Sequence, residues 1–140
     1  MNPSSSLNIF TDGGSRGNPG PAAVGIVIKD AANKIQHSFG QTIGTATNNI
    51  AEYQAVAAAL QWLLQQPVKP RTINFFLDST LVVNQLNGLW KIKDSHLRQK
   101  VILIRQLEAS LNAGISYTAI SRSQNSAADL QVNLALDRTL

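Results

Sequence analysis

The sequence predicts a single α/β domain in which one mixed β-sheet carries helices on its faces. The length supports one domain, because the 140 residues contain no linker, internal repeat or low-complexity tract. The hydrophobic pattern supports both element types, because alternation gives way to a 3.6-residue helical repeat after the first third of the chain. The resulting order of elements, βββαβααβα, is typical of a mixed sheet covered by helices.

Three strands open the chain. Apolar residues recur at strand spacing over residues 7–12, 22–29 and 35–43. The first join is a loop at 15–21, which holds two glycines, two prolines and an asparagine. The second join, at 30–34, is also short. Short joins between consecutive strands indicate an antiparallel meander.

The first helix is bounded by the cap residues Thr47, Asn48 and Asn49 in front and by Pro67 and Pro70 behind. Between these limits the apolar residues form stripes at helical spacing. The later elements are a nearly continuous apolar strand at 71–78, a short helix from Ser79 to about Asn87, a helix at 94–112, a strand at 115–121, and a last helix that Asn125 caps and that runs to about Arg138.

The composition sets limits on the class of protein. Hydrophobic residues make up 44% of the chain, which is enough to bury a core and argues against disorder. The chain has no cysteine, which excludes disulfides and cysteine-ligated zinc. It shows neither a run of about 20 apolar residues nor a secretory signal. We therefore expect a free-standing cytoplasmic monomer that does not bind membranes, with residues 1–6 as a flexible tail.

The chain has only eight Asp and Glu residues, and four of them fall at strand ends or helix starts. Asp12 ends the first strand and Asp78 ends the fourth. If these strands are parallel neighbours, both side chains emerge at one carboxyl edge, where open α/β sheets place ligand sites. Glu52 and Asp129 lie in the first turns of the first and last helices. Asp30, in the turn after the second strand, is expected to tolerate replacement by Asn.

Four carboxylates in one crevice would repel one another strongly without a cation. A ligand set made only of oxygens favours a hard divalent ion such as Mg²⁺ or Mn²⁺. Two such ions can hold the attacking and the leaving oxygen of an in-line displacement. The net charge of +4 favours a polyanionic partner. Together these features indicate a metal-dependent phosphodiester enzyme.

Each acidic residue also has a simpler explanation. Glu52 could form a capping box with Asn49, and Asp129 could favour the helix dipole. Asp78 could belong to a strand-to-helix turn. Asp12 and the two glycines after it could form an ordinary turn or a phosphate-binding loop, although the loop lacks GxxxxGK[ST] and leads into a strand. The occurrence of all four together favours a shared site.

Four segments resemble, in order, the motifs of type 1 ribonucleases H. They are TDGGSRGNPGP at 11–21, TNNIAE at 47–52, DSTLVVNQ at 78–85 and RSQNSAAD at 122–129. The resemblance implies the ribonuclease H fold, with a five-stranded mixed sheet in the order 3-2-1-4-5 and helices on both faces. It also implies hydrolysis of the RNA strand of RNA/DNA hybrids, leaving 3′-hydroxyl and 5′-phosphate ends.

The resemblance further implies a role for each motif residue. Asp12, Glu52, Asp78 and Asp129 become the catalytic carboxylates, which bind two Mg²⁺ ions, or Mn²⁺ in their place, when substrate is bound. The residues matched to contacts with the hybrid are Gly13, Ser15, Gly17, Asn18, Thr47, Asn48, Asn49, Thr80 and Arg122. Among these, Ser15 and Gly17 match the loop that meets RNA 2′-hydroxyls, and Thr47 matches a contact to a DNA phosphate.

The chain departs from the best-known bacterial members at two places. Arg122 stands where many members carry a histidine that aids product departure, so we expect it to take that role or to hold a phosphate. His37 and His96 are expected at ordinary surface positions. The basic handle is reduced to residues 87–94, whose Trp90 could contact the DNA strand or pack in the core. Two alternatives remain: a nucleic-acid-binding module with weak catalysis, and the ribonuclease H domain of a reverse transcriptase.

Overall fold

The computed structural model describes residues 5–138. Its elements are, in chain order, β1 (Ser6–Ser15), β2 (Gly20–Asp30), β3 (Ile35–Ala46), α1 (Asn48–Leu64), β4 (Thr72–Leu77), α2 (Thr80–Leu86), α3 (Ser95–Leu111), β5 (Gly114–Ala119), a 3₁₀ turn η2 (Ser123–Asn125) and α4 (Ser126–Asp137).

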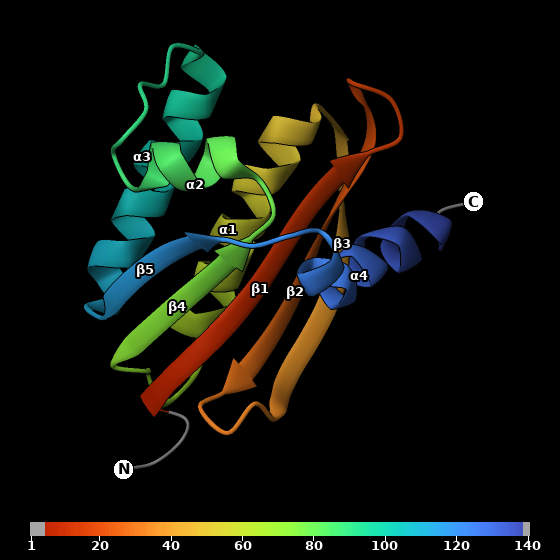
Figure 1. Cartoon of the computed structure of the whole chain (residues 1–140). Coiled ribbons are helices and arrows are strands. Elements are labelled where there is room, and N and C mark those ends of the chain that lie inside the picture. Colours follow the sequence, from red (N-terminus) through yellow and green to blue (C-terminus); the bar gives the residue numbers. More distant parts are fainter. Residues whose placement is uncertain (1–4, 139–140) are drawn as a thin grey trace.

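The five strands form one mixed sheet in the order β3-β2-β1-β4-β5 (Figure 1). β1 pairs antiparallel with β2, and β2 with β3, as the meander predicts. β4 and β5 continue the sheet in parallel on the other side of β1. The fold class and the strand order expected from the sequence are therefore confirmed.

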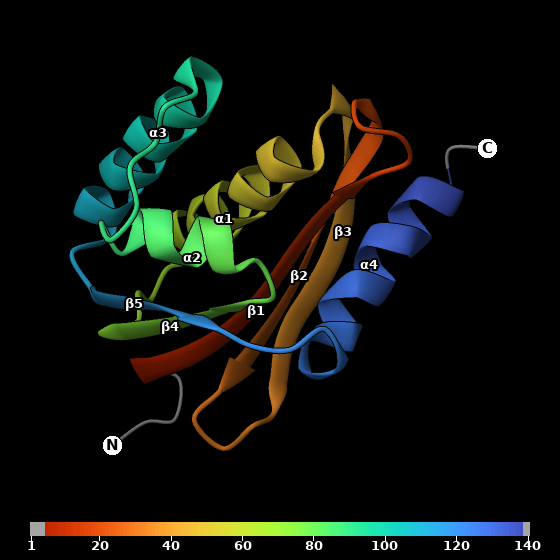
Figure 2. The same ribbon diagram turned by 45° about the horizontal axis from the view of Figure 1, so that its top comes forward.

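The helices lie on both faces of this sheet (Figure 2). α1 packs on β1, with α3 on its outer side, and α4 packs on the opposite face over β2 and β3. The main core fills the space between the sheet and α1, where Ile9, Ile26, Phe75 and Leu60 are completely buried. This apolar layer holds β1 and α1 in fixed positions, and both carry acidic residues of interest.

β1 is longer at both ends than the sequence pattern predicts. Ser6, expected in the tail, pairs with Thr72 as the first residue of the strand, while residues 1–4 lie outside the described part. At the other end, Gly13 and Gly14 stay in the ladder with β2. Asp12 is therefore inside the strand and not at its end, because paired glycines extend a strand as readily as they end one.

Asp30 has more hydrogen-bond partners than its place in a turn predicts, and the expectation that Asp30→Asn leaves turnover nearly unchanged stays a prediction. Its carboxylate is buried and accepts hydrogen bonds from the backbone N–H groups of Ala32, at 2.9 Å, and Lys34, at 3.0 Å. It also accepts one from Gln36 Nε2, at 2.9 Å. In Asp30→Asn the remaining oxygen can still accept from both N–H groups, and the new amide nitrogen would face the exposed Gln36, whose amide can turn to offer its oxygen.

α1 begins two residues earlier than a capping box between Asn49 and Glu52 requires. The N-cap is Thr47, whose side chain accepts a hydrogen bond from Ile50 N. Glu52 therefore lies in the second turn and cannot cap the helix with Asn49. The capping-box explanation of Glu52 is thus wrong, and so is its expected place in the first turn.

The surface residues singled out in the sequence have mixed outcomes. His96 is exposed, whereas His37 is half-buried and stacks on Trp62 at 4.7 Å. Trp90 is 49% exposed, so the core-packing explanation of this residue is wrong.

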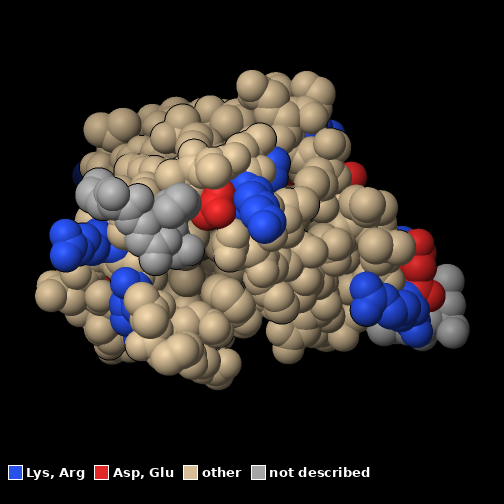
Figure 3. All heavy atoms as spheres, turned by 90° about the horizontal axis from the view of Figure 1, so that it is seen from below, with Lys and Arg blue, Asp and Glu red and all other residues tan. Residues whose placement is uncertain are grey.

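Lys and Arg side chains are dispersed over the face shown in Figure 3 and do not form a single patch there. Within residues 5–138, no helix has both the length and the hydrophobicity that crossing a membrane requires.

Candidate active site

Asp12 and Asp78 meet at one edge of the sheet because β1 and β4 run parallel. Phe10 pairs with Phe76, and two residues further along each chain segment stand Asp12, inside β1, and Asp78, directly after the end of β4. Glu52 approaches them from α1. One oxygen of each of these three carboxylates lies within 4.8 Å of the others. The convergence that the sequence predicts for Asp12 and Asp78 is confirmed, and Glu52 joins them.

Glu52 reaches this edge because α1 lies unusually close to β1. A Cβ atom added to Gly13 would stand 2.1 Å from the backbone carbonyl carbon of Ala51 and 2.4 Å from Glu52 N. Only glycine permits this approach, since real Cβ contacts do not fall below about 3 Å. Gly13, expected as a substrate contact, thus also determines how closely Glu52 can approach Asp12.

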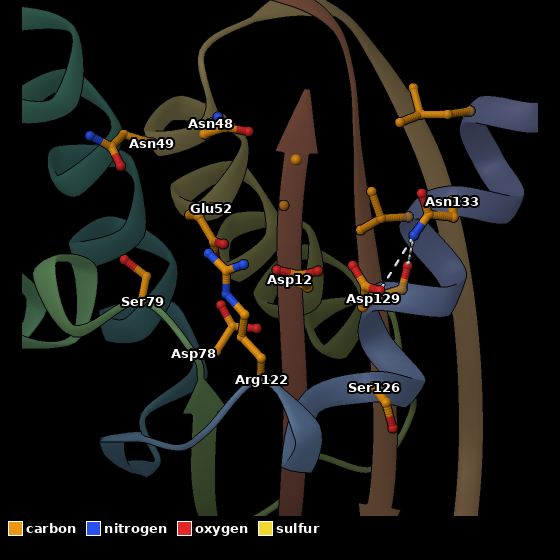
Figure 4. Close-up of a pocket in the computed structure, with 14 residues that line it drawn as sticks. Asp12, Asn48, Asn49, Glu52, Asp78, Ser79, Arg122, Ser126, Asp129 and Asn133 are labelled. Atoms are coloured by element: carbon orange, nitrogen blue, oxygen red, sulfur yellow. Dashed lines mark hydrogen bonds between the residues drawn. The ribbon is translucent and has the colours of Figure 1, made fainter. Parts of the chain in front are cut away.

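Asp129 comes from the other face of the sheet, on α4. This helix also rests on glycines: a Cβ on Gly25 would stand 2.1 Å from Ala128 O, and one on Gly40 would stand 2.2 Å from Gln131 O. Asp129 is exposed and lies outside the group of three carboxylates. Asn133, one turn further along α4, donates from Nδ2 to Asp129 O at 3.1 Å and to its Oδ2 at 3.4 Å (Figure 4).

The acidic residues share one open cavity of about 540 Å³ (Figure 4). Asp12 lies in the middle, with Glu52 and Asp78 on one side of it and Asp129 on the other. The lining residues are Asp12, Gly13, Gly14, Asn48, Asn49, Glu52, Asp78, Ser79, Arg122, Ser126, Asp129, Val132, Asn133 and Leu136. All four predicted carboxylates therefore face the same space, although only three of them cluster.

Burial and mutual repulsion make this cluster electrostatically unfavourable on its own. Burial, followed by the charge of Asp78, raises the pKa of Asp12 from 3.8 to about 7. Burial, followed by the charge of Asp12, raises the pKa of Glu52 well above its usual range. A nearby cation would oppose both shifts.

The cluster also fits a hard divalent ion by its donor atoms. Glu52 Oε2 is buried and has no hydrogen-bond partner among the described residues. A buried carboxylate oxygen without a partner is costly unless a cation neutralises it. All three groups offer oxygen only, which is the donor set that Mg²⁺ and Mn²⁺ prefer. The residues present therefore suit the expected metal.

The expected substrate contacts surround this cavity on one side. Ser15 N donates to Asn48 Oδ1 at 3.0 Å, and Asn48 N donates to Asn18 Oδ1 at 3.0 Å. These bonds connect the loop after β1, which contains Gly17, to the start of α1, where Thr47 is the cap. Among the remaining expected contacts, Gly13, Asn48, Asn49 and Arg122 line the large cavity. Asn18 and Thr47 line a neighbouring one of about 270 Å³. Thr80 is exposed at the start of α2 and lines neither cavity.

Sequence reasoning missed several residues of the cavity wall. Ser79, Ser126 and Asn133 line it, and Asn133 also holds Asp129. The spacing of four residues between Asp129 and Asn133 is the signal that could have found this contact. No comparable spacing singles out the two serines.

Asn125 does not act as the expected helix cap. It occupies the N-cap position of α4, but its side chain makes no capping bond. Instead it is buried and donates from Nδ2 to Thr11 O at 2.9 Å and to Asp78 Oδ2 at 3.1 Å. The side chain is turned so that its Nδ2 donor faces these two acceptors, and its Oδ1 accepts no bond from the helix N–H groups.

The chain matches one family model and many known proteins. The model, described as reverse transcriptase-like, matches residues 10–135. A curated ribonuclease HI of Halobacterium salinarum is 42% identical over 131 residues, which cover 94% of this chain and 64% of that protein. The chain therefore spans less than two thirds of this relative, and it spans 35% of a mycobacterial relative that is 39% identical.

Two solved structures match over almost their full length. The crystal structure of RNase H1 from Halobacterium salinarum has a TM-score of 0.89 and 41% identity, covering 95% of this chain and 98% of that one. The structure of LC11-RNase H1 in complex with an RNA/DNA hybrid has a TM-score of 0.90 and 36% identity, with the same coverage. With the strand order and the acidic cavity, these matches show that the chain belongs to the ribonuclease HI-like family.

Proposed function

We propose that this protein is a metal-dependent endoribonuclease that hydrolyses the RNA strand of RNA/DNA hybrids. The observation that carries the proposal is the group of three carboxylates, Asp12, Glu52 and Asp78, at the wall of an open cavity. Two of them are buried at 7% exposure. A folded protein rarely keeps such a costly cluster unless it serves a function.

The metal is Mg²⁺, with Mn²⁺ as a substitute, and two ions bind when substrate is present. Asp12, Glu52 and Asp78 would hold the first ion, and Asp129 would contribute from the opposite wall to the second. The ions supply positive charge for the attacking and leaving oxygens of an in-line displacement, which yields 3′-hydroxyl and 5′-phosphate ends. Arg122 lines the same cavity and adds a fixed positive charge for the scissile phosphate or the product.

Substrate selection is assigned to the connected loop and helix start beside the cavity. Ser15, Asn18 and Asn48 are held to one another by the hydrogen bonds described above, so their polar groups have defined positions. Such a preorganised polar edge suits recognition of the RNA 2′-hydroxyl, which distinguishes RNA from DNA. The relative solved with an RNA/DNA hybrid supports this choice of substrate. Thr47, in the neighbouring cavity, is assigned to a phosphate of the DNA strand.

The test is cleavage of three end-labelled duplexes, RNA/DNA, RNA/RNA and DNA/DNA, each with Mg²⁺, Mn²⁺ or excess EDTA. We expect cleavage of the hybrid alone, inside the RNA strand, and only with a divalent ion. Treatment of the products with phosphatase should change the mobility of the fragment that carries the new 5′ end. Products that carry 3′-phosphates would contradict the proposed chemistry.

The same assay separates the alternatives. Tight binding of the hybrid without cleavage under any metal condition would identify a binding module. The domain of a reverse transcriptase would cleave hybrids equally, so that alternative is decided by the gene in which the sequence lies. The cytoplasmic location and the monomeric state stay predictions from the sequence; fractionation and light scattering test them.

A further inference from the structure

Asn125 is almost completely buried, at 1% exposure, between three segments of the site. It ends η2 and occupies the N-cap position of α4, the helix that carries Asp129. Its Nδ2 atom reaches Thr11 O, the carbonyl directly before Asp12, and also Asp78 Oδ2. One carboxamide thus contacts the strand of Asp12, the carboxylate of Asp78 and the base of the helix that carries Asp129.

The hydrogen-bond chemistry fixes the direction of this carboxamide. A backbone carbonyl and a carboxylate can only accept, so the nitrogen of Asn125 must face both of them. Its Oδ1 atom is then left buried without a partner among the described residues. The side chain also forgoes the capping bonds that an asparagine usually makes at this position. Asn125 therefore bonds to Thr11 O and the Asp78 carboxylate while it neither caps α4 nor pairs its own Oδ1 atom.

A role in capping α4 alone would not require the side chain to point into the interior. The start of α4 would be capped better by a side chain that accepts from the helix N–H groups, as Thr47 does for α1 and Ser79 does for α2. The interior position instead restrains the Asp78 carboxylate, which otherwise follows the end of β4 on a half-exposed turn. A carboxylate already oriented loses less conformational freedom when it binds a metal ion.

We propose that Asn125 is a positioning residue of the metal site: its carboxamide orients the Asp78 carboxylate and fixes the base of α4 to the strand that carries Asp12. The expected effect of Asn125 on turnover rests on the proposed function. Its expected effect on metal binding does not. Partners that orient metal-binding carboxylates typically change metal affinity by about 10- to 100-fold when they are removed.

The test compares Asn125→Ser and Asn125→Ala with Gln124→Ala. Serine removes the bridging amide but can cap α4, so the fold is retained. Gln124 is an exposed amide in the same turn and bonds only to Ser121. Each protein is titrated with Mn²⁺ alone in a calorimeter, unfolded in urea, and assayed for kcat and KM on the hybrid.

We expect both Asn125 variants to bind Mn²⁺ about 10- to 100-fold more weakly than the wild type. We expect their kcat to fall while KM for the hybrid changes less than about twofold, because the loop and α1 contacts are intact. Gln124→Ala should match the wild type in all three measurements. An Asn125→Ser protein that binds Mn²⁺ as tightly as the wild type would overturn the proposal, whatever its stability. If the wild type fails to cleave hybrids but still binds Mn²⁺ more tightly than Asn125→Ser, the positioning role stands and the ribonuclease function fails.

Discussion

Replacing Asp12 with Asn should stabilise the metal-free protein, and the gain should grow as the pH rises. In the unfolded chain the carboxyl has its ordinary pKa of 3.8, whereas burial and the charge of Asp78 raise the pKa of Asp12 to about 7 in the folded protein. Between these values the folded chain keeps a proton that the unfolded chain has lost. A rise in pH therefore favours unfolding of the wild type.

The two pKa values set the size of this effect. Each pKa unit corresponds to about 1.4 kcal/mol, so, relative to a residue that does not ionise, Asp12 lowers the free energy of unfolding by about 2 kcal/mol at pH 5 and about 4 kcal/mol at pH 8. Asparagine has the same shape and does not ionise. The difference in the free energy of unfolding between Asp12→Asn and wild type should thus increase by about 2–3 kcal/mol from pH 5 to pH 8.

The assay is urea unfolding of both proteins in EDTA at pH 5, 6, 7 and 8, followed by circular dichroism. Asp137→Asn is the matched control, because Asp137 is 59% exposed and its ion pair with Arg16 lies at the surface. Its difference from the wild type should stay within about 0.5 kcal/mol at every pH. Saturating Mg²⁺ should remove the advantage of Asp12→Asn, since the ion neutralises the cluster. A difference that is independent of pH would refute the argument that burial and repulsion dominate at Asp12.

Further predictions concern activity. Asp78→Asn should lower the rate of single-turnover cleavage of the hybrid by at least about 10³-fold, because it removes a metal-binding charge. The control Asp137→Asn should keep the normal rate. Similar rates for the two variants would show that Asp78 serves only the turn after β4. Excess EDTA should stop cleavage by the wild type, and cleavage that continues would exclude the metal mechanism. Asn48→Ala should raise KM for the hybrid several-fold while calorimetry shows unchanged Mn²⁺ binding, because it removes the partner of Ser15 N; an unchanged KM would show that this edge does not read the substrate. Arg122→Ala should lower kcat about 10-fold, a loss of about 1.4 kcal/mol, and Arg122→Lys should recover part of it. The pH–rate profile of the wild type should show no step near pH 6.5 of the kind that a histidine gives. Unchanged turnover and unchanged hybrid affinity in Arg122→Ala would show that Arg122 is only a solvated residue of the loop.

The meeting of Asp12 and Asp78 could be predicted because it follows from topology. Parallel neighbours end at one edge, and an apolar run such as residues 73–77 identifies a buried strand. The place of Glu52 could not be derived in the same way. It depends on how closely α1 approaches Gly13, and such a distance between segments leaves no periodic signal in the sequence. The sequence marked Glu52 only as a carboxylate near a helix start, the resemblance to a family implied its catalytic role, and the structure explains how it reaches the site.

Two polar residues show what the local sequence leaves open. Asp30 and Asn125 are polar residues in turns, and the sequence predicts a local role for each. In the structure Asp30 keeps local partners, the N–H groups of Ala32 and Lys34, and adds Gln36, whereas Asn125 binds the distant Thr11 and Asp78. Local sequence specifies that such a side chain needs partners, but the packing of the whole chain decides which partners it has.

The width of the active-site opening is determined by residues that carry no functional group. α4 rests on the bare backbone of Gly25 and Gly40, two strand positions outside all four motif segments. A methyl group at either position would push the helix, and Asp129 with it, away from the other three acids. Variants recovered in a screen for inactive enzyme would therefore include these glycines, although neither touches metal or nucleic acid. Natural or designed relatives could likewise change the gap that the scissile phosphate must fit by altering these two strand surfaces and leaving every carboxylate unchanged.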